Sequence, residues 1–309
     1  MSEMTLRAAT EADRIEVAEL VCISTNYWYQ THGRGPIFAG GPETTTLFFD
    51  VYEALDPGCC LVAENLATKR LMGSCFYRER STHVSLGIMN AHPNYFGRGV
   101  ARELLGWVIR FAEERAKPVR LVSSAHNLDS YSLYTKAGFT PRQAYQDMLL
   151  SVPEGGLDVK AEGGACVRDA TAEDVEAMAA LEQELCGIKR EKDYRYFIEN
   201  RDGIWHASVL AAESGGIDGF LVSVAHPGSN MLGPGVMKTD AATVALIAAE
   251  LDHHRGRTPV FLLPVDRGEL VRTLYGWGAR NCEIHVHQVR GEWHPLRGVN
   301  MPTFMPETG

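Results

Sequence analysis

The chain has 309 residues, enough for two domains of about 150 residues each. Apolar residues make up 45% and charged residues 22%, which excludes a mainly disordered, collagen-like or coiled-coil chain. The net charge of −9 argues against nucleic-acid binding, which needs surplus cations. No window approaches the roughly 20 apolar residues of a membrane helix. The charged N-terminal segment predicts no secretory signal.

Cysteine and histidine spacing bears on compartment and metal binding. The seven cysteines form no C-x-x-C pair, and their odd number is not that of a secreted disulfide scaffold. We therefore expect reduced thiols and a cytoplasmic protein. His253-His254 and His285-x-His287 are possible metal ligands. No third ligand lies near either pair in the sequence, so no metal site is predicted.

Two segments 161 residues apart resemble each other. Residues 6–13 read LRAATEAD and residues 167–174 read VRDATAED. Each predicts a short strand, then a helix with Thr10 or Thr171 as N-cap and acidic residues in its first turn. The threonine hydroxyl is expected to accept hydrogen bonds from free N–H groups there. An apolar pattern with helical spacing follows each segment.

The order of the following elements also repeats. Residues 61–64 and 71–76 predict a hairpin, as do residues 209–213 and 219–222. Residues 151–164 contain four glycines and one proline and predict a linker. We therefore expect one α/β (α+β) fold with a mixed sheet, present twice: residues 1–150 and residues 165–309.

Residues 84–105 carry a pattern suited to chemistry. An apolar strand ends near Pro93, and a turn containing Gly97 and Gly99 leads into an amphipathic helix that Pro118 stops. The first N–H groups of a helix and its dipole favour an anion at such a turn. Glycines let the backbone approach a phosphate without an intervening Cβ.

A second pattern follows at once. Residues 119–124 predict a strand, and Asn127 opens a short helix that contains Tyr134 and ends at Gly138-Phe139. Together the two patterns resemble the GCN5-related N-acetyltransferase (GNAT) superfamily, whose signature is Gln/Arg-x-x-Gly-x-Gly/Ala after a strand, then Asn, and a Tyr four residues before Gly-Phe. Phe96 replaces the leading Gln/Arg, so that side chain is lost while the amides remain. The resemblance covers roughly residues 4–150 and implies acetyl-CoA as the acyl donor.

The resemblance implies a role for each motif residue. The pantetheine arm of acetyl-CoA would pair with the strand at Met89, Asn90 and Ala91. The pyrophosphate would lie on the amides of the turn, namely those of Gly97, Arg98, Gly99, Val100, Ala101 and Arg102. Asn127 would hydrogen-bond the pantetheine region. Tyr134 would protonate the departing CoA thiolate, or donate a hydrogen bond to it.

The acceptor side carries weaker signals. An amine must lose a proton before or during its attack on the thioester, so a general base is expected within reach. Glu64, His83 and His126 are the candidates.

The family's mobile loop over the acceptor corresponds to residues 26–36. Its aromatic residues Tyr27, Trp28 and Tyr29 would cage an amine, or would simply pack the loop.

Residues 165–309 lack the phosphate-binding turn. The glycines near residues 233–235 lie before the helix start, and Asp240, the predicted N-cap, would repel a pyrophosphate. Leu274 stands four residues before Gly278, where the first half has Tyr134. This half resembles the degenerate second domain of tandem GNAT proteins, in particular the YitH/HolE type. It is expected to shape the acceptor pocket or an interface, and residues 298–306 form either a docked tail or a free end.

These patterns predict an N-acetyltransferase that moves acetyl from acetyl-CoA to a primary amine of a small molecule by direct attack in a ternary complex. One alternative makes the acceptor a protein N-terminus or lysine. Another is an acyl-CoA-binding sensor without turnover. The expected partner is an amine-bearing small molecule, with no membrane, no nucleic acid and no metal, and the protein is expected to be a monomer or homodimer.

Overall fold

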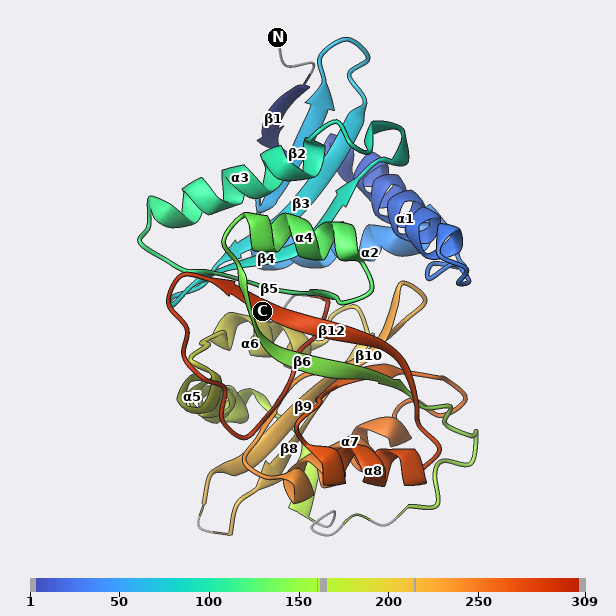
Figure 1. Ribbon diagram of the computed structural model, residues 1–309. Helices are drawn as coiled ribbons and strands as arrows, with labels where there is room; N and C mark the ends of the chain where they lie inside the picture. Colours follow the sequence, from blue (N-terminus) through green and yellow to red (C-terminus); the bar gives the residue numbers. More distant parts are fainter. Residues whose placement is uncertain (1–3, 160, 162–165, 214, 306–309) are drawn as a thin grey trace.

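The computed structural model describes residues 4–159, 161, 166–213 and 215–305 (Figure 1). The first half of the chain contains β1 (Met4–Ala8), α1 (Arg14–Thr31), α2 (Pro42–Leu55), β2 (Cys60–Asn65), β3 (Leu71–Glu79), β4 (Val84–Ala91), α3 (Val100–Glu113), β5 (Val119–Ser124), α4 (Leu128–Lys136) and β6 (Thr140–Leu149). Short 3₁₀ turns at Glu11–Asp13 and Pro93–Tyr95 precede α1 and α3.

The second half repeats this order of elements. It contains β7 (Val167–Asp169), α5 (Val175–Cys186), α6 (Glu191–Glu199), β8 (Trp205–Ala211), β9 (Ile217–His226), β10 (Ser229–Met237), α7 (Asp240–Asp252), β11 (Val260–Pro264), α8 (Gly268–Gly276) and β12 (Arg280–Arg290). A further strand, β13 (Val299–Met301), has no counterpart among the described elements of the first half. The duplication predicted from the sequence is therefore confirmed, as is the mixed α/β fold.

The two similar segments build the same turn before α1 and α5. The Asp13 carboxylate accepts hydrogen bonds from the N–H and hydroxyl of Thr10, at 2.8 and 2.9 Å, and pairs with Arg7. Asp174 makes the same contacts with Thr171 and Arg168. The threonine hydroxyl thus donates to this carboxylate, instead of serving only as an acceptor for N–H groups as expected. The capping box that results fixes how each helix leaves its first strand.

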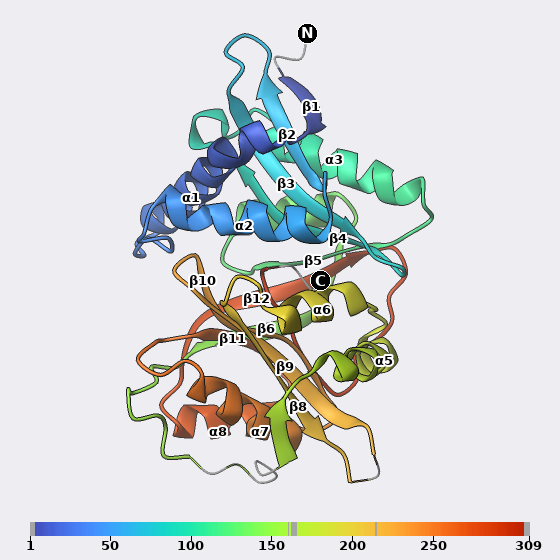
Figure 2. The ribbon, with the colours of Figure 1, turned by 180° about the vertical axis from the view of Figure 1, so that it is seen from behind.

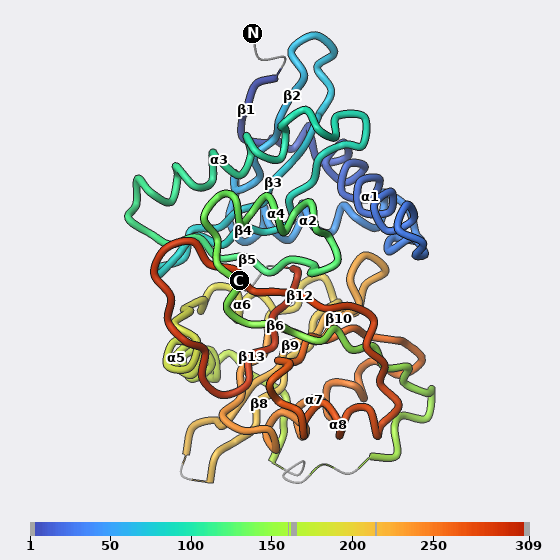
Figure 3. The backbone as a smooth tube through the Cα atoms, viewed as in Figure 1, coloured from blue at the N-terminus to red at the C-terminus, as the bar shows by residue number. Residues whose placement is uncertain are grey.

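The sheet joins the two halves by exchanging their last strands. Its order is β1-β2-β3-β4-β5-β12-β6-β11-β10-β9-β8-β7. β12, from the second half, pairs with β5 of the first half, while β6 pairs with β11 of the second. β12 and β6 run side by side across the middle of the molecule (Figure 3). Neither half therefore completes its sheet with its own last strand.

The helices cover both faces of this sheet. α3 and α4 pack on one face of the first half, and α7 and α8 on one face of the second, over separate apolar clusters. On the other side, α1, α2, α5 and α6 share one apolar core that runs through both halves, with Tyr52 and Phe197 among its fully buried residues (Figure 2). The shared core fixes the two halves against each other.

A buried ion cluster also joins the halves. Arg78 on β3 donates to both oxygens of Asp193 on α6, at 3.1 and 2.9 Å, and neither side chain is exposed. Nη2 of Arg80 lies 2.8 Å from Oδ2 of Asp193 without hydrogen-bond geometry. Asp56, after α2, also pairs with Arg78. Burial alone would raise the pKa of Asp193, but Arg80 and Arg78 outweigh it and hold the pKa well below its usual value.

The predicted linker, residues 151–164, lies partly outside the described residues. Its first part is held in place, because Val152 is buried and its N–H donates to Arg257 O at 2.8 Å. Within the described residues, no helix has both the length and the apolar character needed to cross a bilayer.

Candidate active site

β4 and β5 form a split in the sheet. They run parallel and pair only at Val84–Val119 and Ser85–Arg120, so beyond these residues no described strand pairs with the β5-facing edge of β4. Met89, Asn90 and Ala91 lie at this free end of β4, half-buried, and pair with β3 on their other edge. The buried side-chain Nδ2 of Asn90 has no hydrogen-bond partner among the described residues. This free edge has the form that an extended, amide-bearing ligand would need.

The turn after β4 leads to the N-terminus of α3. Gly97 and Gly99 have φ values of +75° and +84°, a region that residues with a Cβ rarely adopt. The first hydrogen bond of the helix runs from the Glu103 N–H to Gly99 O at 3.0 Å, so the N–H groups of Val100, Ala101 and Arg102 precede the helical ladder. Free N–H donors and a helix dipole at one place favour a negatively charged group there.

Phe96, which stands where the family signature has Gln or Arg, packs against a side chain of α1. The Phe96 ring is 47% exposed and packs edge-on against Tyr27 of α1, with ring centroids 5.8 Å apart. Arg98 lies over the Tyr95 ring at 5.7 Å, and the Arg102 side chain is largely exposed. The two arginines supply positive charge next to the helix N-terminus.

α4 carries the second motif. Oδ1 of Asn127 caps the helix by accepting from the Ser130 N–H at 3.0 Å. The buried Tyr134 ring contacts Phe139 and belongs to the apolar cluster beneath α3, which also contains Cys75 of β3. Burial, and to a lesser extent the neighbouring Cys75 thiol, raises the pKa of Tyr134. Its hydroxyl therefore keeps its proton at neutral pH.

The aromatic run at residues 27–29 is helical, which corrects its assignment to a loop after the first helix. α1 continues to Thr31, and the run occupies its last turns. Successive helical residues point about 100° apart, so the three rings do not form one cage. Tyr27 packs on Phe96, Trp28 stacks on His32 at 4.2 Å, and the Tyr29 hydroxyl donates to Glu283 Oε2 at 2.6 Å.

Glu283 belongs to a buried polar cluster where the halves meet. The Ser124 hydroxyl at the end of β5 also donates to it, and Arg34 Nη1 lies 3.7 Å away. His285 Nδ1 lies 2.7 Å from Oδ2 of Asp147 on β6, while Oδ1 of Asp147 has no hydrogen-bond partner among the described residues. Burial raises the pKa of Asp147.

Neither Glu283 nor Asp147 was expected from the sequence. Their side-chain oxygens lie within 4.8 Å of each other and of a His285 nitrogen. They come together only because β12 of the second half pairs with β6 of the first half. The available signal was the alternation of Glu283, His285 and His287, which places all three on one face of a strand. The polar cluster at the free end of β5 consists of Glu283, Asp147, His285, Ser124 and Tyr29.

Of the three candidate general bases predicted from the sequence, His83 and Glu64 lie away from the polar cluster and His126 lies beside it. His83 is buried at the start of β4, with one ring nitrogen 3.0 Å from the Ser85 hydroxyl, and its pKa is lowered by burial. Glu64 pairs with Arg7 and Lys69 at the far edge of the sheet. His126 is exposed just after Ser124, near the polar cluster, where it helps lower the pKa of Asp147 against the effect of burial.

In the second half, the place equivalent to the split between β4 and β5 is occupied by another strand, β13. β10 and β11 pair in parallel at two positions, as β4 and β5 do, but β13 then pairs with the free edge of β10 from Gly235 to Met237. The tail that includes β13 is therefore docked. Thr239, rather than Asp240, is the N-cap of α7, and its hydroxyl accepts from the Ala242 N–H at 3.1 Å. Among its described residues, this half offers no free strand edge at that place.

Comparison with known proteins finds a family match in the first half of the chain. Residues 25–139 match the family model described as the acetyltransferase (GNAT) family. Over 86 residues the chain is 34% identical to the UPF0157 protein YqkA of Bacillus subtilis, a match that spans 27% of this chain and only 25% of that protein. Residues 25–139, which are less than half of the chain, are therefore similar to GNAT-family acetyltransferases.

Solved structures extend the likeness to both halves. A proposed acetyltransferase from Pyrococcus horikoshii has a TM-score of 0.71 at 18% identity, covering 95% of this chain and 91% of that one. A GCN5-related N-acetyltransferase from Sphaerobacter thermophilus has a TM-score of 0.62 at 16% identity, with coverages of 96% and 98%. A tandem GNAT protein from the clavulanic acid biosynthesis pathway has a TM-score of 0.62 at 14% identity, with coverages of 94% and 100%. The fold is therefore that of tandem GNAT proteins.

Proposed function

We propose that the protein transfers acetyl from acetyl-CoA to a primary amine of a small molecule, by direct attack with both substrates bound. In this proposal residues 1–150 bind the cofactor, and residues 165–309 contribute the acceptor-side strand β12. One observation carries the proposal: the same molecule has a free edge of β4 that leads to the free N–H groups of α3, and a buried carboxylate cluster at the free end of β5. The seven free cysteines support a cytoplasmic location.

The residues of the first half fit acetyl-CoA. The free edge of β4 at Met89–Ala91 and the unpartnered Asn90 amide would pair with the pantetheine arm. The amides between Gly97 and Arg102 would hold the pyrophosphate. Asn127 uses its Oδ1 as a helix cap, which leaves its Nδ2 hydrogens for the pantetheine carbonyls. Bound acetyl-CoA supplies an activated thioester.

Two side chains would manage the protons. Glu283 accepts hydrogen bonds from Tyr29 and Ser124, and Arg34 Nη1 lies 3.7 Å from its Oε2. It would take the proton that the acceptor's ammonium group must lose so that its nitrogen can attack the thioester carbonyl. Tyr134 carries its hydroxyl proton at neutral pH, as tyrosines ordinarily do, and burial raises its pKa further. It would donate a hydrogen bond to the departing thiolate as negative charge develops there.

The burial of the cluster favours a small acceptor. Glu283 is 6% exposed and Asp147 is 2% exposed, so an amine must leave bulk water to reach either carboxylate. Tyr29 and Arg34, at and after the end of α1, also contact Glu283 and leave less room around it. A compact cationic amine meets these conditions, and the net charge of −9 attracts it. Protein N-termini and lysines are the competing acceptors.

Calorimetry with acetyl-CoA, followed by a thiol-release assay over a panel of small amines and basic peptides, tests the proposal. We expect micromolar binding and turnover with a small amine. Glu283→Gln should lower kcat/KM by roughly 10²- to 10⁴-fold, whereas Glu292→Gln, an exposed loop carboxylate, should not change it. Absence of acetyl-CoA binding would sink the proposal. Binding without thiol release would favour a sensor, and release only with peptides would favour a protein acceptor.

A further inference from the structure

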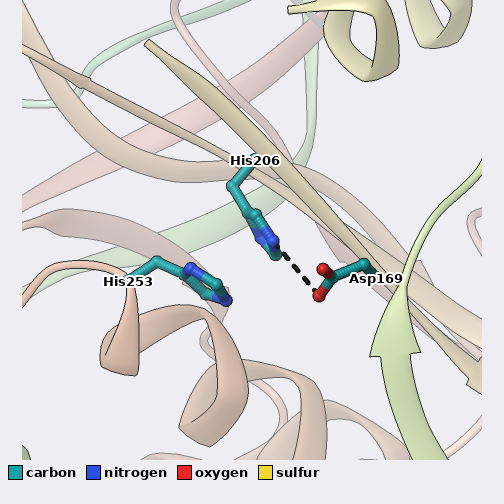
Figure 4. A group of neighbouring side chains, drawn as sticks. All are labelled: Asp169, His206 and His253. Atoms are coloured by element: carbon teal, nitrogen blue, oxygen red, sulfur yellow. Dashed lines mark ion pairs between the residues drawn. The ribbon is translucent and has the colours of Figure 1, made fainter. Parts of the chain in front are cut away.

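A second polar cluster lies at the opposite end of the sheet from the cofactor edge. Asp169 ends β7, His206 is on β8, and His253 follows α7 (Figure 4). Nε2 of His206 lies 3.4 Å from Oδ1 of Asp169, and the rings of His206 and His253 stack with centroids 3.5 Å apart. One ligand atom from each residue lies within 4.8 Å of the other two. The fold therefore gives His253 the ligand partners that its sequence neighbourhood lacks.

A buried carboxylate holds the central histidine. Nδ1 of His206 lies 3.0 Å from Oε1 of Glu250, a residue with no exposed surface. The other Glu250 oxygen accepts from the Ser223 hydroxyl at 2.6 Å. A carboxylate behind the far nitrogen of a histidine is the usual outer partner of a metal ligand, because it fixes the tautomer and the ring orientation.

This arrangement leaves the near nitrogen of His206 in need of a cation. If Nδ1–H donates to Glu250, the lone pair of Nε2 points at the Asp169 carboxylate, and two acceptors 3.4 Å apart repel each other. A metal ion or a second proton on the ring removes the conflict. The stacked ring of His253 adds another nitrogen ligand beside the same place, which favours a metal ion over a proton alone.

We propose that Asp169, His206 and His253 bind a divalent cation of the zinc class. Two imidazole nitrogens and one carboxylate are a set that zinc accepts, with solvent in the fourth position. Zinc bonds are about 2.0–2.2 Å long, so the ligand atoms must move closer. Asp169 and His253 are exposed, while Glu250 holds His206 from behind. Such an ion would tie the edge strand β7 to β8 and to the end of α7.

Calorimetric titration of chelator-treated full-length protein with Zn²⁺ tests the proposal. We expect one ion bound per chain at this cluster, with the thermal unfolding midpoint raised in proportion to occupancy. His253→Ala, a change at an exposed position, should weaken binding at least tenfold and remove the thermal shift. His294→Ala, an exposed histidine outside the cluster, should leave both unchanged.

Two further variants make the result decisive. Glu250→Gln keeps all three ligands and should weaken Zn²⁺ binding by about 10- to 100-fold; its far-ultraviolet circular dichroism must match the parent. Glu283→Gln tests whether the measured ion is held instead by the Glu283 cluster. This variant should not change Zn²⁺ binding by Asp169, His206 and His253. Zn²⁺ binding that persists in His253→Ala would overturn the proposal, and so would the absence of binding at 100 micromolar added metal. The proposal is also wrong if NMR shows a protonated His206 whose titration does not change when Zn²⁺ is added. A proton on the ring, and no metal ion, would then balance the Asp169 carboxylate.

Discussion

Asp193→Ala tests whether the buried ion cluster holds the two halves together. The substitution removes a carboxylate with no exposed surface and leaves Arg80 and Arg78 without their shared partner. Asp56 still neutralises part of the charge on Arg78. Among the described residues, Arg80 forms no ion pair with a carboxylate other than Asp193. Breaking a buried pair from one side typically costs about 3–5 kcal/mol. That loss is large against a typical total stability of about 5–15 kcal/mol.

Urea unfolding measures this cost, and an exposed pair provides the control. Asp218 pairs with Lys238 at 2.8 Å, but about two fifths of each side chain is exposed. Asp218→Ala should therefore cost at most about 1 kcal/mol. Asp193→Ala should shift the unfolding midpoint several times further at similar slope. Equal shifts for the two variants would refute the reasoning that burial makes the Asp193 cluster matter.

Three other outcomes are expected. Gly99→Asp should abolish acetyl-CoA binding in calorimetry, because it places a Cβ and a negative charge at the anion site, while Gly203→Asp, equally strained at φ +68° but exposed in the second half, should not. Tyr134→Phe should lower turnover by roughly 10²-fold or less with little change in acetyl-CoA affinity; an undiminished rate would exclude its proposed role. The folded pKa values of Asp13 and Asp174 are lowered to about 2. The stability they contribute is complete above about pH 5 and is lost as the pH falls through about 4 towards about 2, since the unfolded chain binds more protons there. The thermal midpoint should follow this course, with a shallower slope in Asp174→Asn.

Local patterns predicted much of the fold. The paired Thr-x-x-Asp turns and the glycine-rich turn before α3 depend on contacts within a few residues, so their residue types are visible in the sequence. The end of α1 was harder to place. Residues 27–29 look like an aromatic loop, yet the helix continues to Thr31 because no proline or glycine interrupts it before Gly33.

The polar cluster of Glu283, Asp147, His285, Ser124 and Tyr29 could not be derived in this way. Glu283 and Asp147 lie on strands more than a hundred residues apart, and the sequence of a strand does not say which neighbour it will pair with. β6 and β12 end equivalent halves, so pairing within each half is as consistent with their patterns as the exchange is. The choice between these arrangements depends on the whole sheet and on the core shared by α1, α2, α5 and α6.

The strand exchange has a consequence for how such a chain can arise and be divided. Two identical single-domain subunits that lend their last strands to each other would have the same strand order as this sheet, which is the geometry of a domain-swapped dimer. Joining the copies in one chain makes the pairing intramolecular, so dilution no longer separates them. One copy can then lose its free strand edge, provided that it still supplies β12. The second half, in which β13 pairs with β10 at that edge, therefore stays indispensable, because the sheet of the first half is incomplete without β12.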